Sequence, residues 1–395
     1  MGGWRSIGLL VLGAWMLTAG LGWAAGGKAH VPLPSVVWVD DDGLDAIANG
    51  VTGAFKAIPD ALRAVAPGGV VYVLPGLYDS GANINVTGGK RLIAMRDAIH
   101  PVNPDNDPQN SDWPVIIENR RGNAVQSYGG QSDITIRGFY IRASAGDGVF
   151  VQGEGVATYG VGPGGKKTAL SLKINKICNH VHILGNRIEN TYLDGIKVFA
   201  CNDVSIVGNR ISNTSAITQT KPFHLEQAID FLAVANSVVT ANQVLDNAIG
   251  IVVKGGSVNI QVSGNAFTGP FRWVAQSGEP VNDLLPYSSA SSTQPWGARD
   301  IIVSDNVLNG NPRYADVAVD GCQSCSYIDN VVGGAGFEIV PDSLAVTRGL
   351  CIQGPGLILD RIGSTPIQTS NCPAVFPPAT VVAGTPGGID FAPGD

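Results

Sequence analysis

The sequence has 395 residues, of which 44% are hydrophobic and 14% charged, and its formal net charge is −7. With 25 basic against 32 acidic side chains and no basic runs, it lacks the charge pattern of nucleic-acid-binding proteins. The 52 glycines and the scarcity of helical apolar periodicity predict many short strands and turns.

The first residues have the pattern of a secretory signal peptide. Arg5 precedes an apolar run over residues 7–21, and Gly22 and Ala24 supply small residues at the third-last and last positions before a cut. The run is shorter than the roughly 18 apolar residues that a membrane span needs, and no later segment approaches that length. We therefore expect residues 1–24 to be removed and the protein to be secreted or periplasmic, without a membrane span.

Residues 25–67 are expected to form an N-terminal segment that contains one helix. Phe55, Ile58, Leu62 and Val65 fall on one face at helical spacing. Such a helix can cover the open end of a strand stack, where unpaired edges promote aggregation.

A short motif of alternating apolar residues followed by asparagine recurs along the chain. The spacings between successive asparagines are 23, 33, 23, 41 and 24 residues, so the unit is 23 or 24 residues with two insertions, over about residues 214–225 and 270–298. Upstream, Phe139 precedes the first asparagine by 47 residues, close to two units. The motif asparagines are Asn186, Asn209, Asn242, Asn265, Asn306 and Asn330.

A unit of this length cannot bury its own apolar face, so it must stack on its neighbours. Period-2 alternation points Val204 and Ile206 inward and Ser205 outward. The asparagine at one fixed point of each coil can hydrogen-bond to those above and below it. The repeat therefore predicts a parallel β-solenoid.

The six cysteines test this stacking. Cys178 and Cys201 each precede a motif asparagine by eight residues, which places one directly above the other and predicts a disulfide. We also expect two further bridges, Cys322–Cys325 and Cys351–Cys372. The competing interpretation makes Cys322-Gln-Ser-Cys325 part of a metal or redox site, although no second CxxC or nearby histidine accompanies it.

The chain resembles the right-handed parallel β-helix proteins of the pectate-lyase type, over about residues 68–339. The resemblance implies an all-β, single-domain right-handed parallel β-helix at 68–340, with an N-terminal capping helix. Residues 341–395 would then be a C-terminal segment with a Pro/Gly-rich tail. We also expect a monomer whose partner is an acidic polysaccharide.

Outward positions of a solenoid form columns, because each coil presents the same position to the next. Aligning DGIKVF, QAIDFL and IGIVVK on their inward isoleucines brings the outward residues of three coils into register. The first column holds Lys197, Asp230 and Val252, and the second holds Phe199, Leu232 and Lys254. One interpretation is a surface salt-bridge ladder of small energetic value.

The other interpretation is catalytic. The face resembles that of the calcium-dependent family 9 pectate lyases, whose acidic tract binds Ca²⁺ and whose base is a lysine on a following coil. The resemblance implies Asp194, Glu226 and Asp230 as Ca²⁺ ligands and β-elimination of a uronate polymer. The position expected for the base carries Val252, and Lys254 lies two residues further on.

Two lysines compete for the role of base. Carboxylates around Lys197 would raise its pKa and make it a poor base, unless bound Ca²⁺ reversed that field. Lys254 is flanked by Phe199 and Leu232 in its own column, which favours loss of its proton. We therefore predict Lys254 as the base and keep Lys197 as the alternative.

A looser resemblance to family 6 lyases, which pair a lysine with an arginine on the next coil, adds Arg272 to the catalytic candidates. Phe199 and the aromatic residues Trp273 and Trp296 of the second insertion are candidates for sugar stacking. Hydrolysis is less well supported, because the paired aspartates of polygalacturonases are missing. The rival function is a non-catalytic β-helix that binds or organises cell-surface polysaccharide.

Overall fold

The structure is a computed structural model of the chain. It describes residues 32–98, 113–161, 167–214, 226–247, 249–254, 257–269, 273–277, 298–310, 316–319, 322–333, 336–339, 347–356, 358–360, 367–373, 383–384 and 388–389. All described helices and strands belong to one compact unit, Pro34–Asp395.

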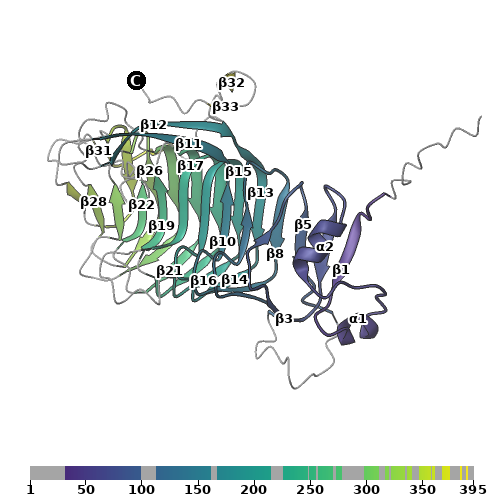
Figure 1. The fold of residues 1–395 in the computed structure, drawn as a ribbon. Helices are drawn as coiled ribbons and strands as arrows, with labels where there is room; N and C mark the ends of the chain where they lie inside the picture. Colours follow the sequence, from purple (N-terminus) through teal and green to yellow (C-terminus); the bar gives the residue numbers. More distant parts are fainter. Residues whose placement is uncertain are drawn as a thin grey trace, which may run out of the picture. The chain divides into compact units, whose positions relative to one another are not determined.

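Most strands pair in parallel with a strand one coil away, which produces three rows of strands (Figure 1). The first row contains β4 (Ile84–Asn85), β7 (Val125–Ser127), β10 (Val149–Gln152), β15 (Ile196–Val207), β17 (Gln227–Thr240), β19 (Ile249–Lys254), β22 (Trp273–Ser277), β25 (Val317–Val319), β28 (Phe337–Ile339) and β30 (Ile358–Asp360). In the second row, β15 and β17 are joined by β1 (Val36–Val39), β2 (Val70–Val73), β5 (Arg91–Ala94), β8 (Ile134–Arg137), β13 (Cys178–Leu184), β20 (Val258–Ser263), β23 (Arg299–Ser304), β26 (Ser326–Ile328), β29 (Leu350–Gln353) and β31 (Ile367–Gln368). The third row is β3 (Gly76–Asp79), β6 (Val115–Asn119), β9 (Tyr140–Ala143), β14 (Arg187–Glu189), β16 (Arg210–Ser212), β18 (Gln243–Leu245), β21 (Ala266–Thr268), β24 (Val307–Asn309) and β27 (Val331–Val332).

The corner between the first two rows lies inside long strands. In β15, Ala200 and Asp203 have φ angles of 54° and 55°, and Ala233 and Asn236 of β17 have φ angles of 53° and 49°. Left-handed residues at matching points of successive strands turn the chain without ending its pairing. The coil is therefore continuous through this corner, and the described chain forms a parallel β-solenoid.

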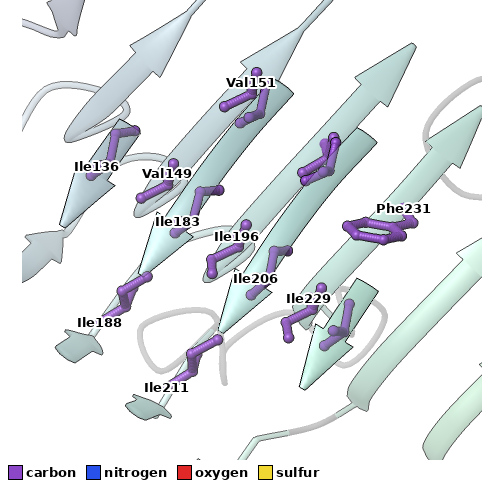
Figure 2. Close-up of a cluster of buried hydrophobic side chains, with 14 of the residues drawn as sticks. Ile136, Val149, Val151, Ile183, Ile188, Ile196, Ile206, Ile211, Ile229 and Phe231 are labelled. Carbon is purple, nitrogen blue, oxygen red and sulfur yellow. The ribbon is translucent and has the colours of Figure 1, made fainter. Parts of the chain in front are cut away.

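The core lies inside the rows and consists of the inward residues of each strand. Val204 and Ile206 are completely buried, while Ser205 between them is half-buried, as the alternation predicts. Figure 2 shows the same inward positions stacked from coil to coil, with Ile136, Ile183 and Ile206 following one another. Burial of these stacked aliphatic side chains is the main driving force for the coil stack.

The predicted asparagine ladder is confirmed. The side-chain amide of Asn209 donates to Oδ1 of Asn242 at 3.0 Å, and its own Oδ1 accepts from the side chain and backbone N–H of Asn186. Gly208, with a φ of 65°, provides the left-handed turn that points Asn209 into the stack. The same side-chain bonds run without interruption from Asn186 to Asn330.

All three predicted disulfides are present. Cys178 pairs with Cys201 in the strand register of β13 and β15, with a Cα–Cα distance of 4.4 Å. Cys322–Cys325 and Cys351–Cys372 are also bridged, with Cα–Cα distances of 6.1 and 5.5 Å. The two sulfurs of the CxxC motif bind each other, so its interpretation as a metal site is wrong.

The helices are short. α1 (Leu44–Ala48) and α2 (Ile58–Ala64) both lie in the predicted N-terminal segment, and α2 buries Ile58 and Leu62 where it contacts β1, β2 and β4. No helix among the described residues is long and apolar enough to cross a membrane.

The parallel stack extends beyond the predicted limits of 68–340. β1 lies inside the segment 25–67 and pairs with β2, and β30 and β31 lie inside the segment 341–395 and pair with β28 and β29. The sequence did not reveal β1 because the excursion that contains both helices separates it from its partner strand.

An inserted hairpin explains the 47-residue spacing between Phe139 and Asn186. β11 (Glu154–Val161) and β12 (Lys167–Lys176) form an antiparallel pair between β10 and β13. The backbone N–H of Phe139 donates directly to Oδ1 of Asn186 at 3.0 Å. The 47 residues between them are therefore one coil with an inserted hairpin, and the interpretation as two units is wrong. A second antiparallel pair near the C-terminus joins β32 (Ala383–Gly384) and β33 (Gly388–Ile389).

The predicted signal peptide (1–24), most of both predicted insertions and most of the Pro/Gly-rich tail lie outside the described residues.

Candidate functional site

The two predicted columns are confirmed by the strand register. Lys197 of β15 pairs with Asp230 of β17, which pairs with Val252 of β19. In the adjacent outward column, Phe199 pairs with Leu232, which pairs with Lys254. The side chains that the sequence placed on one face therefore lie on neighbouring coils.

Ion pairs join the lysines to the aspartates. The Lys197 ammonium lies 2.7 Å from Oδ2 of Asp194 and 3.2 Å from Oδ2 of Asp230. The Lys254 ammonium lies 3.3 Å from Oδ1 of Asp230. Lys254 thus reaches from its own column to the carboxylate of the neighbouring one, and the expectation that its surroundings are mainly apolar is wrong.

A further carboxyl, which the sequence did not single out, belongs to the same group. Asp147 accepts the backbone N–H of Asp194 at 3.0 Å, and Asp194 accepts that of Gln227 at 2.8 Å. Asp147 itself donates its backbone N–H to the side chain of Asn123 at 2.9 Å. These residues form a ladder between coils, in which two aspartates occupy positions of the kind that asparagine fills elsewhere.

The sequence does contain a signal for Asp147. Asp147-Gly148 and Asp194-Gly195 are separated by 47 residues, the same interval that separates Phe139 from Asn186. This signal could not be interpreted from the sequence, because the inserted hairpin was not recognised. An interval of 47 residues therefore did not identify the two residues as members of neighbouring coils. We call Asp147, Asp194, Lys197, Glu226, Asp230 and Lys254 the acid–lysine cluster.

Lys197, Asp230 and Lys254 lie at outward positions of their strands, and Asp147, Asp194 and Glu226 lie just before a strand, yet the cluster is almost entirely removed from solvent. Asp194 and Asp230 are fully buried and Lys254 is 1% exposed. Glu226, at 9%, is the least buried of the four carboxyls, and the Lys197 side chain is 12% exposed. The interpretation as a solvent-exposed salt-bridge ladder is therefore wrong, because removing these groups from water carries a desolvation cost that exposed pairs avoid.

Burial also shifts the proton affinities of the cluster. Desolvation, and then the negative charge of Asp194, raise the pKa of Asp147 to about 8. Desolvation likewise raises the pKa of Asp194, although Lys197 opposes the shift. Near neutral pH, Asp147 therefore holds a proton for most of the time.

Glu226 and Lys197 have different responses to the same surroundings. Desolvation, followed by the charge of Asp194, raises the pKa of Glu226 to about 7. For Lys197, burial favours the neutral form, but the charges of Asp194, Asp230 and Asp147 outweigh burial and raise its pKa. Lys197 is thus a permanent cation, as the sequence predicts, and Glu226 exchanges its proton near neutrality.

The predicted calcium ligands do not form a grouped set of donors. Among the described residues, the only three acidic or metal-binding side chains with ligand atoms within 4.8 Å of one another are Asp40, Asp41 and Asp42. Both oxygens of Asp230 contact lysines, and those of Asp194 accept from Lys197 and Gln227. Two ammonium groups already compensate these carboxylates, so the arrangement does not fit Ca²⁺ and we derive no step through it.

The remaining predicted site residues are less informative. Phe199 is 9% exposed, so little of its ring is available to a sugar. Trp273 begins β22, where its backbone pairs with Ile249. Arg272 and Trp296 lie outside the described residues.

An open hollow of about 570 Å³ lies elsewhere, near the turns that precede β5 and β8. Glycines line much of it, together with Arg91, Gln131, Asp133 and Lys176. None of the acid–lysine cluster lines this hollow, and we place the candidate site at the cluster because its groups have perturbed pKa values and direct mutual contacts.

Residues 115–278 match the family described as "Right handed beta helix region". The fold of the chain is a right-handed parallel β-helix. The predicted fold is thereby confirmed, including its handedness. A search of curated protein sequences finds no match.

Solved β-helix structures resemble this β-helix at low sequence identity. The Dettilon tailspike protein is 14% identical with a TM-score of 0.46, and the match covers 84% of this chain and 64% of the tailspike, less than two thirds of its length. An alginate lyase from Paenibacillus sp. is 13% identical with a TM-score of 0.47, over 79% of this chain and 95% of the lyase. The A-module of the mannuronan C-5 epimerase AlgE6 from Azotobacter vinelandii is 12% identical with a TM-score of 0.42, over 75% of this chain and 74% of the module.

Proposed function

We propose that the protein is an exported enzyme that cleaves an acidic polysaccharide by β-elimination at the acid–lysine cluster. The observation that carries this proposal is the grouping of six ionisable side chains on adjacent coils, five of them buried and the Lys197 side chain only 12% exposed. A solenoid coil needs no charge there to stack, and burying charge opposes folding. Perturbed, mutually coupled ionisable groups of this kind concentrate at functional sites.

Glu226 is the base in this scheme. Its pKa of about 7 lets it both accept and release a proton near neutral pH, and it is the least buried carboxyl of the cluster. The Glu226 carboxylate removes the proton alpha to the uronate carboxyl, and a double bond forms as the carbon–oxygen bond at the neighbouring carbon breaks. Glu226 then returns its proton to the leaving oxygen, so one carboxyl completes the cycle.

Lys197 supplies the positive charge that the reaction needs. Its high pKa keeps it protonated, and its side chain is more exposed than that of Lys254. A fixed cation beside the uronate stabilises the negative charge that develops on its carboxyl when the proton leaves. Lys254, which was the predicted base, neutralises Asp230 in this scheme, and Asp194 orients Lys197.

No step of this scheme uses calcium, which makes the metal requirement testable. Polygalacturonate, alginate and chondroitin would be incubated with the protein, each with Ca²⁺ or with EDTA. Ultraviolet absorbance reports the unsaturated product, and a reducing-end assay reports any cleavage. The proposal predicts that both signals rise together on at least one polymer and that EDTA does not abolish them.

Other results would replace the proposal. Reducing ends without the absorbance of the unsaturated product would indicate hydrolysis. Binding without either signal would favour a non-catalytic β-helix that organises polysaccharide.

A further inference from the structure

The outward column that contains Lys197 continues onto the coils before it. By strand pairing, Lys197 of β15 is preceded by Phe150 of β10, then by Gln126 of β7 and Asn85 of β4. Paired strands lie about 4.8 Å apart. The column therefore passes from the charged cluster to an aromatic ring and then to two amides, one coil at a time.

A second ring stands beside Phe150. Tyr128 follows β7, and its ring meets Phe150 edge to face, with centroids 5.2 Å apart and planes at 84°. Tyr128 is 38% exposed and Phe150 is half-buried, so the pair presents apolar surface to solvent. We call Asn85, Gln126, Tyr128 and Phe150 the aromatic–amide strip.

Hydrogen bonds hold the polar groups of the strip in place. Gln126 is 6% exposed; its amide nitrogen donates to Oδ1 of Asn85 at 2.6 Å, and its Oε1 accepts from Asn83 at 2.7 Å. Asn123 donates to Oε1 of Gln126 at 3.3 Å and to the Tyr128 hydroxyl at 3.2 Å. Because these groups are fixed before any ligand arrives, less ordering entropy is lost when one binds.

The strip itself carries no charge. Its four side chains are two amides, a phenol and a phenyl ring. A sugar carboxylate placed here would find no cation in the strip, whereas an uncharged ring can stack on the aromatic pair and hydrogen-bond to the exposed amide of Asn85.

We propose that the aromatic–amide strip binds an uncharged sugar of the same polysaccharide chain whose uronate lies at Lys197 and Glu226. The substrate is then a mixed polymer, in which uncharged sugars alternate with or adjoin uronates, and not a homopolymer of uronate. This inference rests on the proposed function for the uronate position, but the strip can be tested by binding alone.

The test measures binding in the Glu226→Gln background, so that turnover does not consume the ligand. The probes are two mixed polymers, hyaluronan and gellan, and two uronate homopolymers, polygalacturonate and polymannuronate, titrated by calorimetry. We expect tighter binding to at least one mixed polymer than to either homopolymer. Adding Tyr128→Ala should weaken that binding about tenfold, equivalent to about 1.4 kcal/mol, whereas Tyr128→Phe should retain it.

Two further variants separate recognition from folding. Phe150→Leu keeps apolar volume without the ring and should also weaken binding. Tyr72→Ala removes a tyrosine that stacks on Trp38 in the second row, away from the strip, and should leave binding unchanged. Circular dichroism checks that each variant folds.

The outcomes are distinct from those of the cleavage experiment. Unchanged binding in both Tyr128→Ala and Phe150→Leu, tighter binding to the homopolymers, or no binding to any of the four polymers would overturn the inference. Strip-dependent binding to a mixed polymer without cleavage by the unsubstituted protein would uphold the inference and contradict only the proposed function.

Discussion

The ammonium of Lys254 lies 3.3 Å from Oδ1 of Asp230, although the two residues belong to different coils and different outward columns. Lys197 contacts the other oxygen of the same carboxylate at 3.2 Å. Asp230 is therefore held between two lysines in a site from which water is excluded. Removing either lysine would therefore leave a buried carboxylate with only one counter-ion.

Replacing Lys254 by methionine should destabilise the protein substantially. Lys254→Met keeps the length of the side chain but leaves buried Asp230 with one counter-ion, and breaking a buried pair costs about 3–5 kcal/mol. Because Lys197 remains, we expect a loss of about 3 kcal/mol in the free energy of unfolding, measured by denaturant titration.

The control for this variant is an ion pair on the surface. Arg63 and Asp60 pair with side chains that are 73% and 52% exposed, so Arg63→Met should change stability by less than about 1 kcal/mol. Equal effects of the two substitutions would mean that the Lys254 pair contributes no more than a surface pair.

Asp147 should make the protein less stable as the pH rises. Its folded-state pKa of about 8 lies above the ordinary value of 3.8, mainly because of burial and then Asp194. Its contribution to stability is complete below the unfolded-state pKa and is lost progressively as the pH rises through the folded-state pKa. Asp147→Asn retains an oxygen that accepts the N–H of Asp194 but cannot ionise.

We therefore expect Asp147→Asn to fold and to lose less stability than the parent protein between about pH 5 and about pH 8. Denaturant midpoints of both proteins at the two pH values measure this difference. Parallel loss of stability in both would show that Asp147 binds no additional proton on folding over this range.

Asparagines of the buried ladder should contribute more to the free energy of unfolding than asparagines that bridge coils nearer the surface. Asn209→Ala removes an acceptor for the buried N–H of Asn186 and a donor to Asn242, and each unsatisfied buried group costs about 1–3 kcal/mol. Asn202 on the same coil also bridges its neighbours, but it is only half-buried.

We expect Asn209→Ala to lower the free energy of unfolding by at least about 2 kcal/mol and Asn202→Ala by about 1 kcal/mol or less. Chemical denaturation of the pair is the measurement. A larger effect at Asn202 would contradict the role that we assign to the buried ladder.

Periodicity was sufficient to predict the coil. The alternation around Val204 and the fixed spacing of the asparagines determine which residues face inward and which coils are neighbours, because every strand repeats the same environment. The Cys178–Cys201 bridge and the outward columns follow from that register. The hairpin Glu154–Lys176 was missed because it has no copy elsewhere in the chain and stretches one coil to twice its usual length.

The chemistry of the cluster could be predicted only in part. Register placed Lys197 beside Asp230, but it does not say where the flexible stem of Lys254 leads, and that side chain crosses to the neighbouring column. Asp147 was missed because the inserted hairpin prevented the recognition of its coil and that of Asp194 as neighbours. Burial of the outward face could not be predicted either, since alternation assigns outward residues to solvent by default.

The pH dependence of unsaturated-product formation tests the central claim most directly. Burial and the charge of Asp194 raise the pKa of Glu226 to about 7, and only the deprotonated carboxylate can accept a proton, so the rate should rise as the pH passes about 7. Glu226→Gln should abolish the reaction. The control is Glu189→Gln, which changes a carboxylate of the third row that is hydrogen-bonded to Tyr140 and Arg187. This variant should keep both the rate and its pH profile. A Glu226→Gln variant that retains the rate of the parent protein, or a parent profile without a rise near this pH, would contradict the account.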